Sequence, residues 1–535
     1  MEKRDYIVAI DLGSSSATIA VGAKDDDGRL DIIDIISQPT SGLSRGEIAN
    51  RQEVISVLQS LKEKIQDKHH ISISDTYTGI SGKHIKCTNQ DYFVYVGERS
   101  DGEIRKEDKL ALHDVMNNVQ AEDGIKILDR IPQTYIIDGQ EKVKDPVGRF
   151  GSKLASTFCF VLGSWKPIDR LEKALMGVGI KPVKTFANAL ASAQAVTTAD
   201  EREMGVAVLD IGAGTSDLCI YYDDSVRFVR GIPFGAADIN NDIKQQGILE
   251  RYVEALKIKY GRAMADGIEK DQLIIISGLK GKDQKKISQK NLAIIIENRL
   301  KDIITFVREE IADSGYADKL GAGLVLTGGC TLLPDIDALF RLGMDVRLAV
   351  PDIYVNERSK EIASDPRYAT VIGILLRVME AGQRSSVEVF KSINQYSAPR
   401  PAEPVKRPAP QPKPEPKPET AKRNGSQRLG QIGADRNATG ADDGRRSDRY
   451  RYRNRRREKA QGQENRRIFR QTQKHRSRLV RVARRGRRGD LIFSAERLFY
   501  ERQHFRHTRH RADYPLDYNG RRSRRCGRQR PEPHD

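Results

Sequence analysis

Short apolar runs alternate with helix-spaced apolar stripes along the first 390 residues of the chain. Five runs of three to five apolar residues predict buried β-strands, at residues 6–10, 18–21, 206–209, 218–222 and 324–326. Two longer stretches repeat apolar residues at helical spacing and predict amphipathic helices, at residues 54–65 and 294–310. This alternation of strands and helices is typical of an α/β fold.

One strand–turn–strand pattern occurs twice, with its aspartates 199 residues apart (210 − 11). Each copy has an apolar strand that ends in aspartate, then an apolar residue, a glycine and small or hydroxyl residues, and then a second apolar strand. The first copy contains Asp11, Gly13, Ser14, Ser15 and Ser16, and the second contains Asp210, Gly212, Gly214 and Thr215. A single copy would more often be an ordinary β-hairpin with a glycine turn, but two matching copies favour two repeated lobes around one ligand.

The residue types in these turns suit a phosphate group. Glycines let the backbone approach an anion closely, successive turn amides form an anion-binding nest, and hydroxyl groups add donors. Asp11 and Asp210 are expected to face the same cleft, where their oxygen atoms could hold hydrated Mg²⁺. The pattern therefore predicts two loops that clamp one nucleotide.

Two further segments are candidates for the nucleoside end of such a ligand. Gly328 and Gly329 follow an apolar strand and would let a base or ribose pack on the backbone, although a plain strand-to-helix turn has the same pattern. Glu254 and Lys257 lie one turn apart on a predicted helix that ends at Gly261. Taken alone, they indicate no more than a surface ion pair.

The charge of the chain is divided unevenly. Residues 401–535 contain 39 Lys+Arg and 16 Asp+Glu, a net charge of +23, which leaves 53 (92 − 39) and 58 (74 − 16), net −5, for the first 400. The overall charge of +18 is therefore no sign that the acidic head binds nucleic acid. Nine of the 21 prolines lie between Pro399 and Pro418, within residues 391–424, and predict an extended linker.

The segment after the linker has an unusual basic composition. From Gly425 onward there are 31 arginines and only two lysines, a bias that solvation does not explain. Either residues 425–535 form an arginine-rich interaction tail, or they are read in a shifted frame relative to the ancestral gene; in both cases we expect no packed core. Within residues 490–505 one apolar face could lie on an anionic membrane, or could be a chance stripe; it includes Leu491, Ile492, Leu498 and Phe499.

Other classes of protein do not fit the sequence. Its five cysteines are scattered without a C-x-x-C pair, which excludes a disulfide framework or a cysteine-type zinc site on spacing and suggests the reduced thiols of a cytosolic protein. The amino-terminal residues lead directly into a predicted strand, so no signal peptide is expected. There is no apolar stretch of 18 residues, so no membrane span is expected.

The order of the two phosphate loops and the glycine pair resembles that of the superfamily of actin, sugar kinases and chaperone ATPases. Within it, residues 5–382 resemble the FtsA family of bacterial cell-division proteins. The resemblance rests on the stretches AIDLGSSSATIAVG, EREMGVAVLDIGAGTSDLCIY, GIPFGAADINNDI, VEALKIKYG, VLTGGCTLLPDI and DPRYATVIGILL.

The resemblance implies an actin-like two-lobed α/β fold with ribonuclease-H-like repeats, an FtsA-type inserted subdomain and a disordered basic C-terminal tail. The first lobe would begin with residues 1–83, the insertion would cover residues 84–161, and residues 162–390 would complete both lobes. The insertion itself has a predicted strand at residues 92–96, a helix near 106–118 and an apolar segment at 126–137, with no phosphate-type turn. This suits an interaction module.

The resemblance also implies a site for ATP and Mg²⁺. Phosphate contacts are carried over to Gly13, Ser14, Ser15, Ser16, Gly212, Gly214 and Thr215, adenosine contacts to Glu254, Lys257, Gly328 and Gly329, and water-mediated Mg²⁺ binding to Asp11 and Asp210. Ser16 stands where many relatives have lysine, so that positive charge is not expected. Asn188 stands where hydrolysing members often have glutamate and cannot act as a general base, so we expect at most a slow ATPase with unknown catalytic residues.

The function implied by the resemblance is ATP-dependent polymerisation that links FtsZ filaments to the cytoplasmic face of the cell membrane at the division site. The FtsZ C-terminal tail would dock beside the helix at residues 291–312, with Arg299 as a contact, because arginine favours carboxylates. The inserted subdomain would serve filament contacts and recruit later divisome proteins, and a C-terminal helix would bind membrane lipids. The alternatives are a sugar or metabolite kinase of the same superfamily, or a nucleic-acid-binding protein that acts through its arginine-rich tail.

Overall fold

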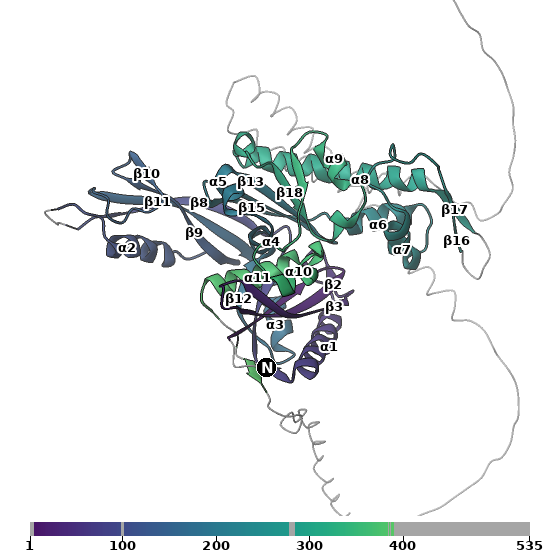
Figure 1. Ribbon diagram of the computed structural model, residues 1–535, viewed down its shortest axis with the longest axis horizontal. Coiled ribbons are helices and arrows are strands. Elements are labelled where there is room, and N and C mark those ends of the chain that lie inside the picture. Colours follow the sequence, from purple (N-terminus) through teal and green to yellow (C-terminus); the bar gives the residue numbers. More distant parts are fainter. Residues whose placement is uncertain (1–4, 98–100, 278–283, 384, 386, 390–535) are drawn as a thin grey trace, which may run out of the picture. The chain divides into compact units, whose positions relative to one another are not determined.

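The computed structural model describes residues 5–97, 101–277, 284–383, 385 and 387–389. This part of the chain forms a first lobe, a second lobe and an inserted subdomain (Figure 1), which correspond to the three larger of its four hydrophobic clusters. The linker and tail at residues 391–535, including the expected membrane face of residues 490–505, lie outside the described residues. Among the helices that the structure describes, none is long and apolar enough to cross a bilayer.

The first lobe is built on a five-stranded sheet with the order β12-β7-β1-β2-β3. Its strands are β1 (Tyr6–Leu12), β2 (Ser16–Lys24), β3 (Leu30–Pro39), β7 (Asp75–Ile80) and β12 (Lys181–Ala187). The helices of this lobe are α1 (Arg51–His69), α3 (Trp165–Met176), α4 (Asn188–Val196), α10 (Lys360–Ala363) and α11 (Ala369–Glu380). Two small pairings complete it: β4 (Leu43–Ser44) with β5 (Glu47–Ile48), and β6 (Ile71–Ile73) with β20 (Val387–Val389).

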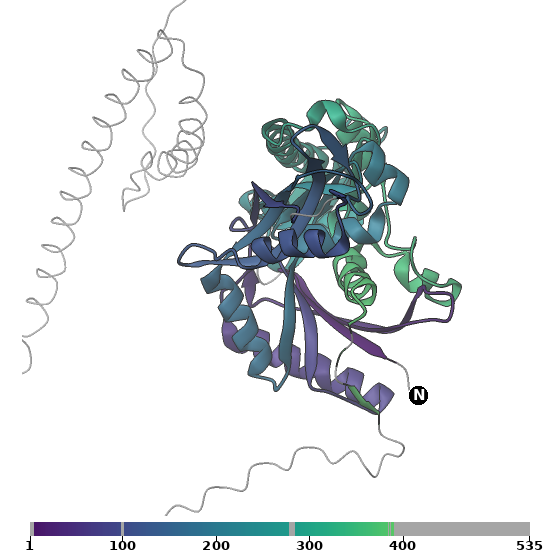
Figure 2. The same ribbon diagram turned by 90° about the vertical axis from the view of Figure 1, so that its left-hand side faces the viewer.

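Helix α1 shows why the sequence pattern was informative. The side chain of Asn50 caps its first turn by accepting from the amides of Gln52 and Glu53, and His70 ends it in a left-handed conformation. The predicted apolar stripe packs on the first-lobe sheet (Figure 2), and its buried members include Leu58, Leu61 and Ile65. The predicted helix is thus confirmed, with a longer extent than its apolar residues alone indicate.

The second lobe repeats the pairing scheme of the first. Strand β1 has an antiparallel neighbour, β2, and a parallel neighbour, β7; β13 likewise has antiparallel β14 and parallel β18. The strands of the second lobe are β13 (Val206–Ile211), β14 (Ser216–Tyr222), β15 (Ser225–Ile232), β18 (Leu324–Thr327) and β19 (Val346–Leu348), with a separate hairpin of β16 (Leu273–Ile276) and β17 (Lys285–Ser288). The internal duplication predicted from the sequence is confirmed at the level of strand pairing.

The helices of the second lobe surround this sheet. They are α5 (Ala199–Met204), α6 (Ala236–Gln245), α7 (Glu250–Tyr260), α8 (Gln289–Asp313) and α9 (Ile336–Arg341), with short 3₁₀ helices η2 (Ala317–Lys319) and η3 (Gly329–Leu332). Two further 3₁₀ helices, η4 (Glu357–Ser359) and η5 (Pro366–Tyr368), contact β3 and α11 of the first lobe. Strand β13 is buried on both faces: Val206 and Val208 pack in the first core, whereas Ala207 and Leu209 pack in the second. One strand therefore contributes to both cores.

The inserted subdomain continues the sheet of the second lobe, which has nine strands in the order β10-β9-β11-β8-β15-β14-β13-β18-β19. Its elements are β8 (Lys86–Tyr95), α2 (Lys106–Asn117), β9 (Ile125–Ile137), β10 (Glu141–Val143) and β11 (Lys153–Ser164). Helix α2 covers one face of the sheet (Figure 1). Leu112 of the helix and Phe158 of β11 are buried in the core between them. Strand β8 begins six residues before the strand expected at 92–96. The sequence did not indicate its first half, because that half is polar and half exposed and carries no apolar alternation.

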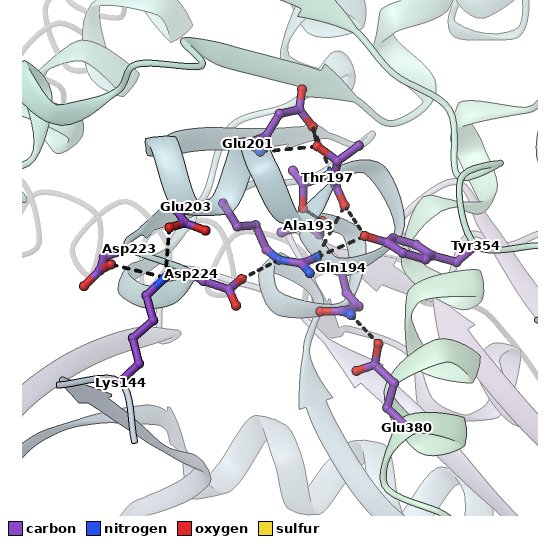
Figure 3. Close-up of polar contacts among 12 residues, drawn as sticks. Lys144, Ala193, Gln194, Thr197, Glu201, Glu203, Asp223, Asp224, Tyr354 and Glu380 are labelled. Atoms are coloured by element: carbon purple, nitrogen blue, oxygen red, sulfur yellow. Dashed lines mark hydrogen bonds and ion pairs between the residues drawn. The ribbon is translucent and has the colours of Figure 1, made fainter. Parts of the chain in front are cut away.

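Polar contacts join the insertion to the second lobe. Buried Arg227 donates from Nε to the carbonyl oxygen of Tyr222 (2.9 Å), from Nη1 to Gln133 Oε1 (3.2 Å) and from Nη2 to Thr134 Oγ1 (3.1 Å). At the surface, Lys144 lies 3.0 Å from Glu203 and 3.7 Å from Asp223 (Figure 3). The exposed pairs contribute little to stability, so the buried guanidinium is the stronger attachment.

Helices α4 and α11 form the tightest contact of the first lobe. A Cβ atom at Gly373 would lie 1.8 Å from the carbonyl oxygen of Ala191, so only glycine allows this approach. Gln194 donates to Glu380 across the same pair of helices (2.7 Å), and Tyr354 donates to the carbonyl oxygen that ends α4 at Thr197 (2.9 Å; Figure 3). All nine residues of α4 are buried, which fixes Asn188 at its first turn.

Candidate nucleotide-binding site

The two predicted phosphate loops have the same local geometry. The amide of Gly13 donates to the carbonyl oxygen of Ser16 at 2.9 Å, and the amide of Gly212 donates to that of Thr215, also at 2.9 Å. Each hydrogen bond closes the turn between two antiparallel strands, β1–β2 in the first lobe and β13–β14 in the second. The structure therefore places the two copies of the motif at equivalent positions of the two lobes.

The two loops meet. A Cβ atom at Gly214 would lie 2.3 Å from Ser14 Oγ and 3.0 Å from the backbone nitrogen of Arg45. The second loop is supported from behind by the first turn of α6, where the amides of Ala236 and Ala237 donate to the carbonyl oxygens of residues 212 and 213 (3.0 and 2.7 Å). Gly214 is thus a position where any side chain would push the loops apart.

Three buried carboxyl groups lie beside the loops. Burial, reinforced by the negative charge of Asp210, raises the pKa of Asp11 to about 7, although a hydrogen bond from Asn188 Nδ2 (3.2 Å) opposes the shift. Burial raises the pKa of Asp210 to about 6, opposed by a hydrogen bond from Thr370 Oγ1 (3.0 Å). The pKa of Asp217 is raised well above its usual range by burial and by the other two carboxylates.

This charge arrangement fits a hydrated cation. Buried carboxylates that raise one another's pKa are stabilised by a positive charge between them, and Mg²⁺ binds oxygen atoms while retaining water. Within the described part of the chain, no three His, Cys, Asp or Glu side chains converge closely enough to form a direct metal site. Asp11 and Asp210 are the side chains that would hold Mg²⁺ here, and the water-mediated binding expected from the sequence stays a prediction.

Asp217 and Ser81 were not singled out by the sequence. Ser81 Oγ, at the end of β7, donates to the carboxylate of Asp217 (2.7 Å) and lies 2.9 Å from Thr215 Oγ1. Asp217 could have been found from the sequence, because it is a charged residue inside the otherwise apolar strand β14. Ser81 carried no such signal, because its partners are more than 130 residues away in the chain.

The expected adenosine residues lie on α7 and in the glycine pair after β18, and one of these glycines contacts Asp210. Gly328 has a left-handed φ of 89°, and a Cβ atom there would lie 2.2 Å from Asp210 Oδ1. Lys257 is buried and pairs with Glu254 at 2.8 Å, as the spacing alone suggested. Burial raises the pKa of the Cys330 thiol to about 11, and the nearby Lys257 charge opposes the shift. The helix α7 therefore lies next to the chain that follows the glycine pair.

Arg299 lies on α8 and is engaged within the second lobe. Its Nε and Nη2 atoms bind both carboxylate oxygens of Asp242 on α6 (2.6 and 3.0 Å), and Nη1 lies 3.2 Å from Asp302. About a quarter of its side chain is exposed. Arg299 thus has a structural role, because it joins α6 to α8. A test of peptide binding by Arg299 must distinguish binding from this structural role.

Comparisons with known proteins decide the family. The family model for the cell division protein FtsA matches residues 207–373, and that for the SHS2 domain inserted in FtsA matches residues 82–162. The FtsA of Neisseria meningitidis is 30% identical over 385 residues, which span 70% of this chain and 90% of that protein. The chain belongs to the FtsA family of cell-division proteins.

A second FtsA agrees with the family assignment. The FtsA of Pseudomonas aeruginosa is 29% identical over 402 residues, which cover 75% of this chain and 95% of that protein. Among solved structures, a chain of the PilM–PilN type IV pilus biogenesis complex gives a TM-score of 0.48 at 17% identity, over 70% of this chain and 98% of that chain. The predicted family is confirmed, as is the actin-like α/β fold with an FtsA-type insertion.

The two glycines of the second loop should respond differently to substitution. We expect Gly214→Ala to abolish ATP binding, because its Cβ would collide with Ser14 and with the backbone at residue 45. Gly212→Ala should have a much smaller effect, since the nearest atom to its Cβ is 3.2 Å away. Equilibrium binding of ATP measures both. Equal losses in the two variants would contradict the contact between the loops.

The pKa values of the carboxyl groups predict how Mg²⁺ dependence varies with pH. A raised pKa means that protons occupy Asp11 and, in part, Asp210 at pH 6, and these protons compete with Mg²⁺. We compare the affinity for Mg-ATP with the affinity for metal-free ATP and expect the ratio of the two to rise about tenfold from pH 6 to pH 8. The reason is that the ionised fraction of a group with a pKa of about 7, such as Asp11, rises by the same factor over this range. Asp11→Asn should flatten this rise. A ratio that stays constant in the parent protein would argue against water-mediated Mg²⁺ binding here.

Proposed function

We propose that this protein is an ATP-binding, actin-like subunit that polymerises and links FtsZ filaments to the cytoplasmic face of the cell membrane at the division site. The observation that carries the proposal is the meeting of two equivalent glycine loops beside three buried carboxyl groups. Such loops supply backbone amides and hydroxyl groups to phosphates, and the carboxyl groups supply the charge that Mg²⁺ offsets. Because Ser14 lies against Gly214, the triphosphate would have to turn the Ser14 hydroxyl toward itself on binding.

Hydrolysis would be slow at best. Asn188, at the start of α4, donates its amide to Asp11, and its Oδ1 atom is buried without a hydrogen-bond partner. An amide can orient a water molecule, but it cannot accept the proton of that water at neutral pH. The protein would therefore act as an ATP-dependent switch before it acts as an enzyme. A role as a sugar or metabolite kinase is less favoured, because the chain belongs to a cell-division family and contains its inserted domain.

The inserted subdomain would supply contacts to other subunits and to later divisome proteins. The face of its sheet opposite α2 exposes Phe93 and Tyr95, which form an edge-to-face pair with centroids 5.5 Å apart. Lys153 lies over the Phe93 ring at 4.0 Å. Exposed aromatic side chains with an adjacent cation are common at protein–protein contacts, which supports this assignment.

The second lobe offers a surface that would suit an acidic peptide such as the expected FtsZ tail. The hairpin β16–β17 exposes Leu273 and Ile275, and Lys286 is the cross-strand neighbour of Ile275. Helix α8 follows this hairpin and carries Arg299. We propose that an acidic peptide binds here, with apolar side chains on the hairpin and carboxylates near the basic residues.

Arg299 and Asp242 test this assignment together. We expect Arg299→Glu to weaken binding of an FtsZ tail peptide at least about tenfold, or 1.4 kcal/mol, without changing ATP affinity. Asp242→Asn removes the internal ion pair but leaves the arginine, so it should keep or strengthen peptide binding. Fluorescence anisotropy with a labelled peptide measures both. If the two variants weaken binding equally, Arg299 acts only through the packing of α6 on α8.

Membrane attachment is assigned to residues outside the described part of the chain, from the charge division of −5 against +23. We expect the full chain to float with anionic vesicles and residues 1–395 to remain in solution while still binding ATP. A purely electrostatic attachment should disappear as salt approaches 0.15 M, where the Debye length is about 8 Å. A salt-resistant fraction that Leu498→Asp with Phe499→Asp removes would indicate an inserted helix. Flotation of residues 1–395 as strong as that of the full chain would contradict the assignment.

A further inference from the structure

The turn of the small hairpin β4–β5 lies at the junction of both phosphate loops. Its two central residues, Arg45 and Gly46, have left-handed φ values of 50° and 78°. The amide of Gly46 donates to Ser14 Oγ in the first loop (3.3 Å), and the backbone nitrogen of Arg45 lies against Gly214 in the second. A Cβ atom at Gly46 would lie 2.6 Å from the carbonyl oxygen of Ser81, so the turn is also fixed from behind.

The Arg45 side chain extends along the second loop. Its Nη2 atom lies 3.0 Å from Asp238 Oδ1, and its guanidinium carbon is 5.8 Å from the centre of the Phe234 ring. Asp238 belongs to the first turn of α6, whose amides at residues 236 and 237 support the second loop. The backbone of Arg45 therefore contacts the second loop at Gly214. Its guanidinium contacts Asp238 in the first turn of α6, the turn that supports the same loop from behind.

The ion pair with Asp238 is one that Arg45 can leave easily. The Arg45 side chain is 54% exposed, and water screens such pairs strongly. Asp238 has a second partner, because its other oxygen atom accepts from the amide of Gly235 (3.1 Å). Asp238 would therefore remain satisfied at the helix terminus if the guanidinium moved away.

The site near Arg45 collects negative charge, which a cation would offset. The site already contains Asp11, Asp210 and Asp217, and a triphosphate would add further negative charge to the same place. Ser16 supplies no positive charge from the first loop. A guanidinium presents paired donors that match phosphate oxygen atoms. In addition, Arg45 has a left-handed φ, a backbone conformation that favours glycine over arginine.

We propose that Arg45 is a nucleotide-binding residue that moves from Asp238 to the terminal phosphates of a bound nucleoside triphosphate. This inference rests on the proposed ATP binding and adds to it a ligand from a third segment of the chain. It assigns to the β4–β5 turn the charge that the first phosphate loop lacks. The turn contacts both loops through the backbone of Arg45 and Gly46, and the Arg45 side chain would bind the phosphates.

Arg45→Gly tests the side chain alone, because glycine accepts the left-handed backbone. We expect this variant to keep the parent melting temperature, to bind Mg-ATP and inorganic tripolyphosphate at least tenfold more weakly, and to bind adenosine as before. Arg45→Lys should recover part of the loss. The matched control is Arg51→Ala, which removes an arginine that bonds to the carbonyl oxygen of Lys173 instead, and it should leave all three affinities unchanged. Isothermal titration calorimetry gives the affinities.

The outcomes separate this inference from the proposed function. If the parent protein binds ATP and Arg45→Gly binds it equally well, the inference is wrong and the ATP site stands. If the parent protein binds neither ATP nor tripolyphosphate, the proposed ATP site itself is wrong. An equal loss of adenosine and tripolyphosphate binding in Arg45→Gly would show that the residue only shapes the turn, and would also overturn the inference.

Discussion

The burial of three carboxyl groups at one place is the constraint on which the rest of the site depends. Asp210 and Asp217 face each other on the neighbouring strands β13 and β14, whereas Asp11 lies near the end of β1, so Asp11 joins them only while the two lobes are in contact. Three negative charges cannot be buried together without a proton, a hydrogen-bond donor or a cation to offset them. The raised pKa values favour proton binding at these carboxyl groups, and Ser81, Asn188 and Thr370 supply hydrogen-bond donors. A bound cation would replace the protons, which makes closure of the lobes depend on what occupies the site.

The repeated strand pairing explains how such a site can be built. In each lobe, a central strand has an antiparallel neighbour that follows it in the chain and a parallel neighbour from a later segment. The turn between the first two strands is then directed to the same edge of each sheet, and the two turns meet. Strand β13 adds rigidity, because its two faces belong to different cores. The loops are thus held by packing on both sides and have little freedom to separate independently.

The sequence predicted the local features well because they depend on neighbouring residues. The glycine turns, the strands on either side and the stripe of α1 follow from short-range patterns, and the family resemblance correctly indicated the insertion. The contacts of Ser81 with Thr215 and Asp217 could not be predicted in this way, and neither could the position of the Arg45 turn. These contacts join segments from different lobes, and no periodicity records which segments meet. Arg299 shows the opposite case: its charge was noted, but its internal partner Asp242 was visible only in the structure.

The junction of the inserted subdomain has a consequence for local unfolding. Strand β8 pairs with β15 at a single position, Lys86 with Arg230, whereas β8 and β9 pair with β11 over nearly their whole lengths. The subdomain also encloses its own core around Leu112 and Phe158. Amide hydrogens around that core should therefore exchange with solvent as one cooperative unit, whereas Leu128 and Val161 at the base of the insertion pack in the first core. Local opening of this part of the insertion would leave the hydrogen bonds of the phosphate loops intact, because those bonds lie within the two lobes.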